Sequence, residues 1–180
     1  MKDLLTKHKA AILEKWYHLI LETYPSDAAS HLKKEKDPFT NPVGSTFSQE
    51  IEPIFNGLLE GKGAEPLCGS LDRMIRIRSV QDFSPSQAVG FIFLLKKAIK
   101  QTLEAQAKKP GTSVGGWGLD EKIDELALRA FDLYMACREK IFDIKVKEIR
   151  TQKEMMQRML NRINLPDSEE EEKKEKGVSS

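Results

Sequence analysis

The spacing of apolar residues predicts that most of this chain is helical. Apolar side chains recur at intervals of three and four residues over long stretches, which places them on one face of an α-helix. The expected helices cover residues 3–24, 27–34, 46–60, 65–80, 85–107 and 119–164. The pattern therefore predicts an all-α fold class.

Local signals mark where several of these helices begin. The run Ser84-Pro85-Ser86-Gln87 predicts a helix start, with Ser84 as the cap, proline in the first turn and glutamine closing a capping box. A second capping box is expected at Thr46-x-x-Gln49. Residues 37–44 hold two prolines and a glycine, so they are expected to form a loop.

The last expected helix is long and carries two apolar stripes. No proline or glycine occurs from Leu119 to Asn164, so the helix would measure about 65–70 Å. The stripe assigned to the globular core consists of Ile123, Ala127, Ala130, Tyr134, Cys137, Ile141 and Ile144. The stripe assigned to a short coiled coil, called here the coiled-coil stripe, consists of Phe142, Val146, Ile149, Lys153, Met156, Leu160 and Ile163.

Two arrangements would bury the coiled-coil stripe. The helix would pair with a second copy in a parallel homodimer, or it would fold back on its own domain. Pairing is favoured because the helix is longer than a globular domain of this size needs. Lys153 occupies a core position of the stripe, where it would weaken the pairing but help to fix its register.

The expected organisation is one compact helical bundle with two extensions. Residues 1–140 form the bundle, for which a globin-like arrangement is one alternative. Residues 141–165 form the projecting helix and coiled coil. Residues 166–180 are rich in glutamate and lysine and nearly free of apolar side chains, so they are expected to form a disordered acidic tail.

Composition narrows the functional classes. The 180 residues include 39% hydrophobic and 32% charged residues, and no stretch is long and apolar enough to span a membrane. The net charge of +1 gives no overall field for nucleic acid. With no signal peptide expected, the predicted location is cytoplasmic. Cys68 and Cys137 fit a reducing compartment as buried thiols, a disulfide being the alternative.

A search for catalytic and metal-binding patterns finds none. The chain has no HxxxH, CxxC or GxSxG pattern and no phosphate-binding loop of the required spacing. A globin-type haem would need a histidine late in the helical order, and no histidine follows His31. The motifs therefore predict no metal site and no cofactor, with haem ligation by a methionine, a cysteine or His18 left as the alternative.

The segment Asp72 to Arg78 is the one concentrated group of charges. Arg73 and Arg76 would be neighbours on a helix, and Arg78 would be rotated away from them. Arginines bind carboxylate or phosphate groups, so the three are candidates for an anionic ligand. The alternative is a solvated face with salt bridges to Asp72 and Asp82. Further candidate ligand-binding residues are Trp16 and His18, for which packing at the core boundary is the alternative.

A longer stretch of the chain resembles a known family. Asn41-Pro42-Val43-Gly44 and the run from Arg78 to Lys96, RSVQDFSPSQAVGFIFLLK, resemble the RsbRD-type N-terminal domain, the sensory module of RsbT co-antagonist proteins. Trp16 and Tyr24-Pro25 fit the same pattern, and the resemblance covers about residues 10–145. It implies an all-α bacterial signal-input domain of stress-response regulation and not an enzyme. Only a polar tail follows the long helix, so a stand-alone protein is expected.

Three functions remain open on this basis. The favoured one is a sensor or adaptor in signal transduction that binds a ligand or partner and transmits through its long helix. The second is an interaction scaffold or accessory protein for a redox or respiratory complex of the sulfate-reduction type. The third is a cofactor enzyme. The expected partners are a second copy of the chain and a signalling or redox protein, with neither nucleic acid nor membrane insertion.

Overall fold

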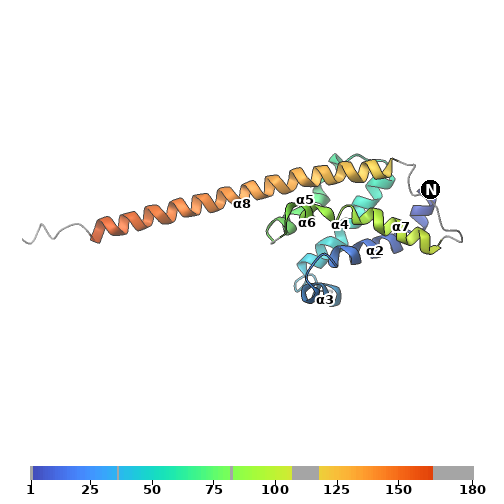
Figure 1. Ribbon diagram of the computed structural model, residues 1–180, viewed down its shortest axis with the longest axis horizontal. Coiled ribbons are helices and arrows are strands. Elements are labelled where there is room, and N and C mark those ends of the chain that lie inside the picture. The colour runs from blue at the N-terminus through green and yellow to red at the C-terminus, as the bar shows by residue number, and fades with distance from the viewer. Residues whose placement is uncertain (1, 36, 82, 107–117, 164–180) are drawn as a thin grey trace, which may run out of the picture. The chain divides into compact units, whose positions relative to one another are not determined.

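The computed structural model describes residues 2–35, 37–81, 83–106 and 118–163, and every regular element in them is a helix (Figure 1). The predicted all-α class is therefore confirmed. The elements are α1 (Lys2–Lys7), α2 (Lys9–Leu21), α3 (Ser26–Lys34), α4 (Pro42–Leu59), the 3-10 turn η1 (Glu65–Leu67), α5 (Cys68–Ser79), α6 (Pro85–Gly90), α7 (Leu94–Gln106) and α8 (Leu119–Ile163). Residues 107–117, in the predicted connector, and the predicted tail lie outside the described residues.

The chain divides into a first unit that ends at Arg138 and a second that begins at Glu139. In the first unit, α2 packs along α7 and α4 packs along α5 (Figure 1). The interior is filled by apolar side chains at helical spacing from all of these helices and from the first part of α8. Its largest fully buried apolar side chains include Trp16, Phe47, Phe55, Phe91, Ile12, Ile20 and Met74.

The start of α4 differs from the prediction. The helix begins at Pro42, and its cap is Asn41, whose Oδ1 accepts a hydrogen bond from the Gly44 N–H at 2.7 Å. The expected capping box does not form, because Thr46 already lies inside the helix, where its hydroxyl donates to the Pro42 carbonyl at 2.8 Å. The predicted loop is correspondingly shorter.

Asn41 also joins α4 to the preceding helix. Its Nδ2 donates to the carbonyls of Leu32 at 2.9 Å and Glu35 at 2.8 Å, at the end of α3. One buried side chain thus satisfies groups at the end of one helix and the start of the next. Gly44 completes the arrangement, because a Cβ there would lie 2.8 Å from Asn41 Oδ1.

The predicted capping box at Ser84 is confirmed, but the helix that it starts is interrupted. The Ser84 hydroxyl accepts from the Gln87 N–H at 3.3 Å, and Gln87 Oε1 accepts from the Ser84 N–H at 3.0 Å. After α6 the backbone changes to bonds between residues three apart, including Leu94 N–H to Phe91 O at 3.2 Å, before α7 begins. The run from Ala88 to Leu95 consists of seven apolar residues and Gly90, and the glycine is the one local residue that weakens the expected continuous helix.

The interruption exposes backbone groups that side chains use. Trp16 Nε1 donates to the Phe91 carbonyl at 2.9 Å, in the buried core. The Ile92 N–H bonds to Val89 O at 3.2 Å, three residues earlier, and the bond from the Phe91 N–H to the Gln87 carbonyl that a continuous helix would have is absent from this described segment. The Gln87 carbonyl accepts instead from Arg78 Nη2, at 3.3 Å.

The first predicted helix is divided in the structure, whereas the last one is continuous. The division lies at His8, whose ψ of 13° lies outside the helical range. The predicted long helix is confirmed as α8, a single 45-residue element. Its expected core stripe is buried as far as Tyr134, but Ile144 is 57% exposed. Cys137 and Ile141 are half-buried, so the burial of this stripe decreases within the last two turns.

Candidate functional site

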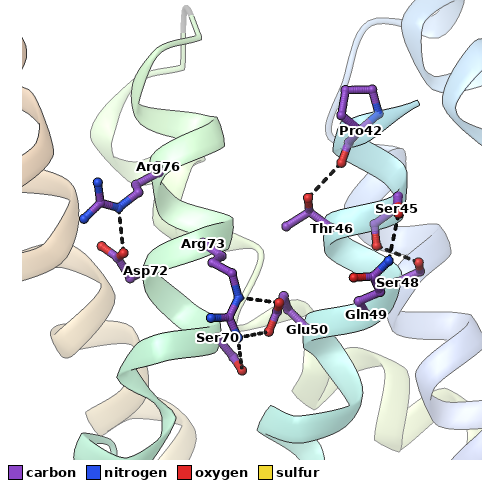
Figure 2. Close-up of polar contacts among 10 residues, drawn as sticks. All are labelled: Pro42, Ser45, Thr46, Ser48, Gln49, Glu50, Ser70, Asp72, Arg73 and Arg76. Carbon is purple, nitrogen blue, oxygen red and sulfur yellow. Dashed lines mark hydrogen bonds and ion pairs between the residues drawn. The ribbon is translucent and has the colours of Figure 1, made fainter. Parts of the chain in front are cut away.

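Two of the three candidate arginines lie in ion pairs on the surface. Arg73 extends from α5 to α4, where Nε and Nη2 both donate to the Glu50 carboxylate, the second at 2.8 Å (Figure 2). Arg76 pairs with Asp72 one turn earlier on α5, with Nε to Oδ2 at 2.6 Å, on the side turned away from α4 (Figure 2). The predicted pairing with Asp72 is therefore present for Arg76. Both cations already have a carboxylate partner.

The Arg73 contact also sets the charge of a buried acid. Glu50 is only 8% exposed. Hydrogen bonds from Arg73 lower the pKa of Glu50 below its ordinary value, against the opposing effect of burial. The pair connects α4 with α5, and the Glu50 carboxylate is held ionised by it.

Arg78 lies in a different environment from the other two. Its side chain is wholly buried, which contradicts the expectation of a solvated face. Nη2 donates to Thr23 Oγ1 at 2.7 Å and to the Gln87 carbonyl at 3.3 Å. Nε and Nη1 are buried and have no hydrogen-bond partner among the described residues. Asp82, the second acid expected to pair with these arginines, lies outside the described residues. A buried guanidinium with unpaired donors is rare, because burying a charge without a partner is costly.

Four aromatic rings surround this guanidinium and form what we call the Arg78 cage. The guanidinium carbon lies 4.3 Å from the centroid of Phe83, 5.2 Å from those of Tyr24 and Phe91, and 5.8 Å from that of Phe47. The rings also pack edge to face, Tyr24 on Phe83 and Phe47 on Phe91. Cation–π attraction offsets part of the cost of burying the charge.

The cage holds a positive charge that no acidic side chain of the described residues balances. None of the ion pairs in this part of the chain includes Arg78. Burial lowers the pKa of Arg78 from its ordinary value, yet a guanidinium remains protonated in proteins. Burial likewise raises the pKa of Tyr24, against the opposing effects of Arg78 and a hydrogen bond with Gln81, so the phenol stays neutral.

A cavity of about 550 Å³ lies next to the cage. Its lining residues are Thr23, Tyr24, Pro25, Gln81, Phe83 and Gln87. Four of them touch Arg78, through the Thr23 hydroxyl, the Gln87 carbonyl and the rings of Tyr24 and Phe83. The remaining lining groups are uncharged. The buried guanidinium thus contacts four of the six residues that line this cavity, although it is not itself a lining residue.

The other two predicted ligand residues lie elsewhere. Trp16 is fully buried in the core and bonds to the Phe91 carbonyl. His18 lies in a separate cleft of about 440 Å³ between α2 and α7, with Glu14 at 4.0 Å from its Nε2. The five predicted residues therefore do not form one site. Arg78 is the candidate that lies against a cavity together with unpaired donors.

The sequence carried a signal for the burial of Arg78. Leu71, Met74 and Ile75 precede Arg78 by seven, four and three residues, so all four lie on the buried face of α5. Thr23, Tyr24, Phe83 and Gln87 were not predicted as site residues. Three of them, Tyr24, Phe83 and Gln87, belong to the segments that carried the family resemblance.

The described residues contain no group of histidine, cysteine and acidic side chains arranged to hold a metal ion. No helix in the described segments is both long and apolar enough to cross a membrane. Cys68 and Cys137 are free and half-buried, and the Cys68 sulfur accepts a hydrogen bond from Arg129 Nε at 3.2 Å.

Comparison with known proteins supports the resemblance stated above. The family model described as RsbT co-antagonist protein rsbRD N-terminal domain matches residues 10–146. A curated protein of Archaeoglobus fulgidus, described as an uncharacterized protein, is 30% identical over 154 residues, which cover 83% of this chain and 90% of the relative. No solved structure is significantly similar to the chain.

Proposed function

Because the chain belongs to the RsbT co-antagonist protein rsbRD N-terminal domain family, we propose that it is a signal-input domain that senses a ligand or partner and transmits through α8. The family is one of stress-signalling regulatory domains and not of enzymes. The proposed location is the cytoplasm, because the free thiols Cys68 and Cys137 suit a reducing compartment.

The observation that carries this proposal is the continuity of α8. The helix begins in the core of the first unit, where Ile123, Leu126 and Tyr134 are buried. It continues without interruption into the second unit, where apolar side chains such as Phe142, at 66%, are exposed. A continuous helix couples the packing of its first half to the position of its second half, as expected of a transmitting element.

Two contacts link the Arg78 cage to the first part of α8. Tyr134 Oη donates to the Phe83 carbonyl at 3.4 Å, and Arg138 Nη1 donates to the Ser79 carbonyl at 3.1 Å. Ser79 follows Arg78 in the chain, and Phe83 forms one wall of the cage. A movement of the cage would therefore change contacts made by α8, which supplies a route for the signal.

The proposed output is pairing of two copies through the coiled-coil stripe. Its exposed members include Phe142, Ile149, Met156, Leu160 and Ile163, each at least half exposed. A row of exposed apolar side chains at steps of three and four residues matches the seam of a coiled coil. Lys153 lies within this row and would favour one register over others.

Pairing is tested by placing charges on the stripe of the full chain. The Ile149→Asp, Met156→Asp double variant should be monomeric by light scattering, while the unchanged chain should have the mass of a dimer. Thr151→Asp is the control, because Thr151 is exposed on the face of α8 opposite the stripe, and it should remain dimeric. A monomeric unchanged chain, or a dimeric double variant with normal helical circular dichroism, would contradict the proposal.

A further inference from the structure

The Arg78 cage has a property that packing alone does not explain. A fully buried guanidinium normally lies beside a carboxylate, because an unpaired buried charge is destabilising. Here the described neighbours provide four aromatic rings, one hydroxyl and one carbonyl. The Nε–H and both Nη1–H groups have no acceptor among the described residues. Among the described residues the Arg78 charge therefore has no acidic partner, and an anionic ligand would balance it.

The neighbouring cavity is the place where such an anion would enter. It shares Thr23, Tyr24, Phe83 and Gln87 with the surroundings of Arg78. The Thr23 hydroxyl donates to the Ile20 carbonyl at 2.7 Å while it accepts from Arg78 at 2.7 Å, so one side chain of the cavity wall contacts the guanidinium directly. Phe83, which covers the guanidinium most closely, is only half-buried and lies between α5 and α6.

We propose that this cavity binds a small organic monocarboxylate whose negative charge is balanced by Arg78, which names the ligand class for the signal-input function proposed above. The guanidinium of Arg78, which contacts the cavity wall, matches one negative charge, since the six lining residues are uncharged. The Nε2 amide groups of Gln81 and Gln87 would donate to the carboxylate, because their Oε1 atoms already accept from Tyr24 Oη and the Ser84 N–H. The rings of Tyr24 and Phe83, with Pro25, would contact the apolar part of the ligand.

The same composition disfavours highly charged ligands. A phosphate dianion or a nucleotide needs several cations or a series of backbone N–H donors. The nearest other arginines on α5 already pair with acids, Arg73 with Glu50 and Arg76 with Asp72. A monocarboxylate with a short apolar body is therefore the favoured occupant of the volume of about 550 Å³.

Isothermal titration calorimetry of the full chain with butyrate and benzoate tests the site. We expect saturable binding of at least one of them, with butyramide, the neutral counterpart of butyrate, and inorganic phosphate both weaker by about tenfold or more, as loss of a charged hydrogen bond implies. No saturable heat with either carboxylate up to about 10 mM would overturn the proposal. Equal binding of butyramide and butyrate would also overturn it.

Variants locate the binding. Arg78→Met keeps an unbranched side chain of similar length in an aromatic environment, and it should weaken carboxylate binding about tenfold or more. Arg76→Met removes an exposed arginine of the same helix and should bind as the unchanged chain does. Gln81→Leu changes a cavity wall outside the cage and should also weaken binding. Should Arg78→Met fail to fold by circular dichroism, Gln81→Leu and the butyramide comparison still decide the outcome.

The two proposals fail separately. If the chain binds a carboxylate but neither its mass by light scattering nor the contacts of α8 change, the signalling role is overturned and the binding site is retained. A dimer that depends on the coiled-coil stripe but binds no carboxylate would overturn the site and retain the role of α8.

Discussion

The guanidinium carbon of Arg78 lies 4.3 Å from the centroid of the Phe83 ring, the closest of its four aromatic contacts. Phe83 also meets Tyr24 edge to face, with centroids 5.1 Å apart. The ring therefore contributes to stability both as an apolar group and through its π-electrons.

Phe83→Leu should lower the free energy of unfolding by about 1–2 kcal/mol, because leucine keeps most of the apolar cover but cannot attract the cation. Denaturant unfolding followed by circular dichroism measures this change. The matched control is Phe39→Leu, since Phe39 is 95% exposed, and it should change stability by less than about 0.5 kcal/mol. Equal effects of the two substitutions would show that the cage contact adds nothing.

Gly44→Ala should destabilise the protein by about 1–3 kcal/mol, because the new Cβ would displace the Asn41 side chain and break its hydrogen bonds to α3 and α4. Gly90→Ala is the control, since nothing lies within 4 Å of a Cβ at that position. It should be neutral or slightly stabilising. Thermal unfolding of both variants compares them, and a neutral Gly44→Ala would contradict the role of Asn41.

Ser84→Ala should cost about 1 kcal/mol, because the Gln87 N–H loses its acceptor at the start of α6. Ser84→Gly should cost only a few tenths of that, since glycine is tolerated at caps. Pro85→Ala should have little effect. The backbone N–H at the first position of a helix has no partner within the helix, so the helix loses nothing when proline lacks it. Chemical denaturation measures all three, and the reverse order of effects would exclude the capping box as a stabilising element.

Stability should fall in acid partly through Glu50. Its folded-state pKa is lowered by Arg73, so its contribution is present above the ordinary glutamate pKa of about 4.3 and is lost as the pH falls through the lower, folded-state value. Unfolding measured from about pH 6 down to about pH 3 should show a steeper loss for the unchanged chain than for Glu50→Gln.

The control for this acid effect is Glu148→Gln, at an exposed position of α8. It should keep the steep loss of the unchanged chain. Parallel profiles for the unchanged chain and Glu50→Gln would mean that the Arg73 contact does not persist in solution.

The parts of the fold that depend on near neighbours were predictable from the sequence. The Ser84 capping box spans three residues, and the 45-residue length of α8 follows from the absence of proline and glycine. The ion pair of Arg76 with Asp72 also spans only four residues. Each of these features is determined within one helical turn or by the composition of one element.

The missed features depend on residues that are distant in sequence. Arg78 meets Thr23 across 55 positions, and Trp16 meets Phe91 across 75. The helix interruption after Gly90 places a carbonyl where Trp16 can reach it, and the glycine alone does not predict where that carbonyl bonds. The Arg78 cage therefore could not be predicted from neighbouring residues in the sequence. The burial of Arg78 itself was indicated, because it lies on the same face of α5 as Leu71 and Met74.

The contact between Asn41 and Gly44 also bears on how this family diversifies. The side chain of one residue fills the space that a side chain on the other would need. A lineage that replaces Asn41 with a smaller residue is free to accept alanine at position 44, while one that retains Asn41 is not. We expect the two positions to be inherited as a pair across relatives, so their covariation would identify this helix junction in chains whose overall similarity is low.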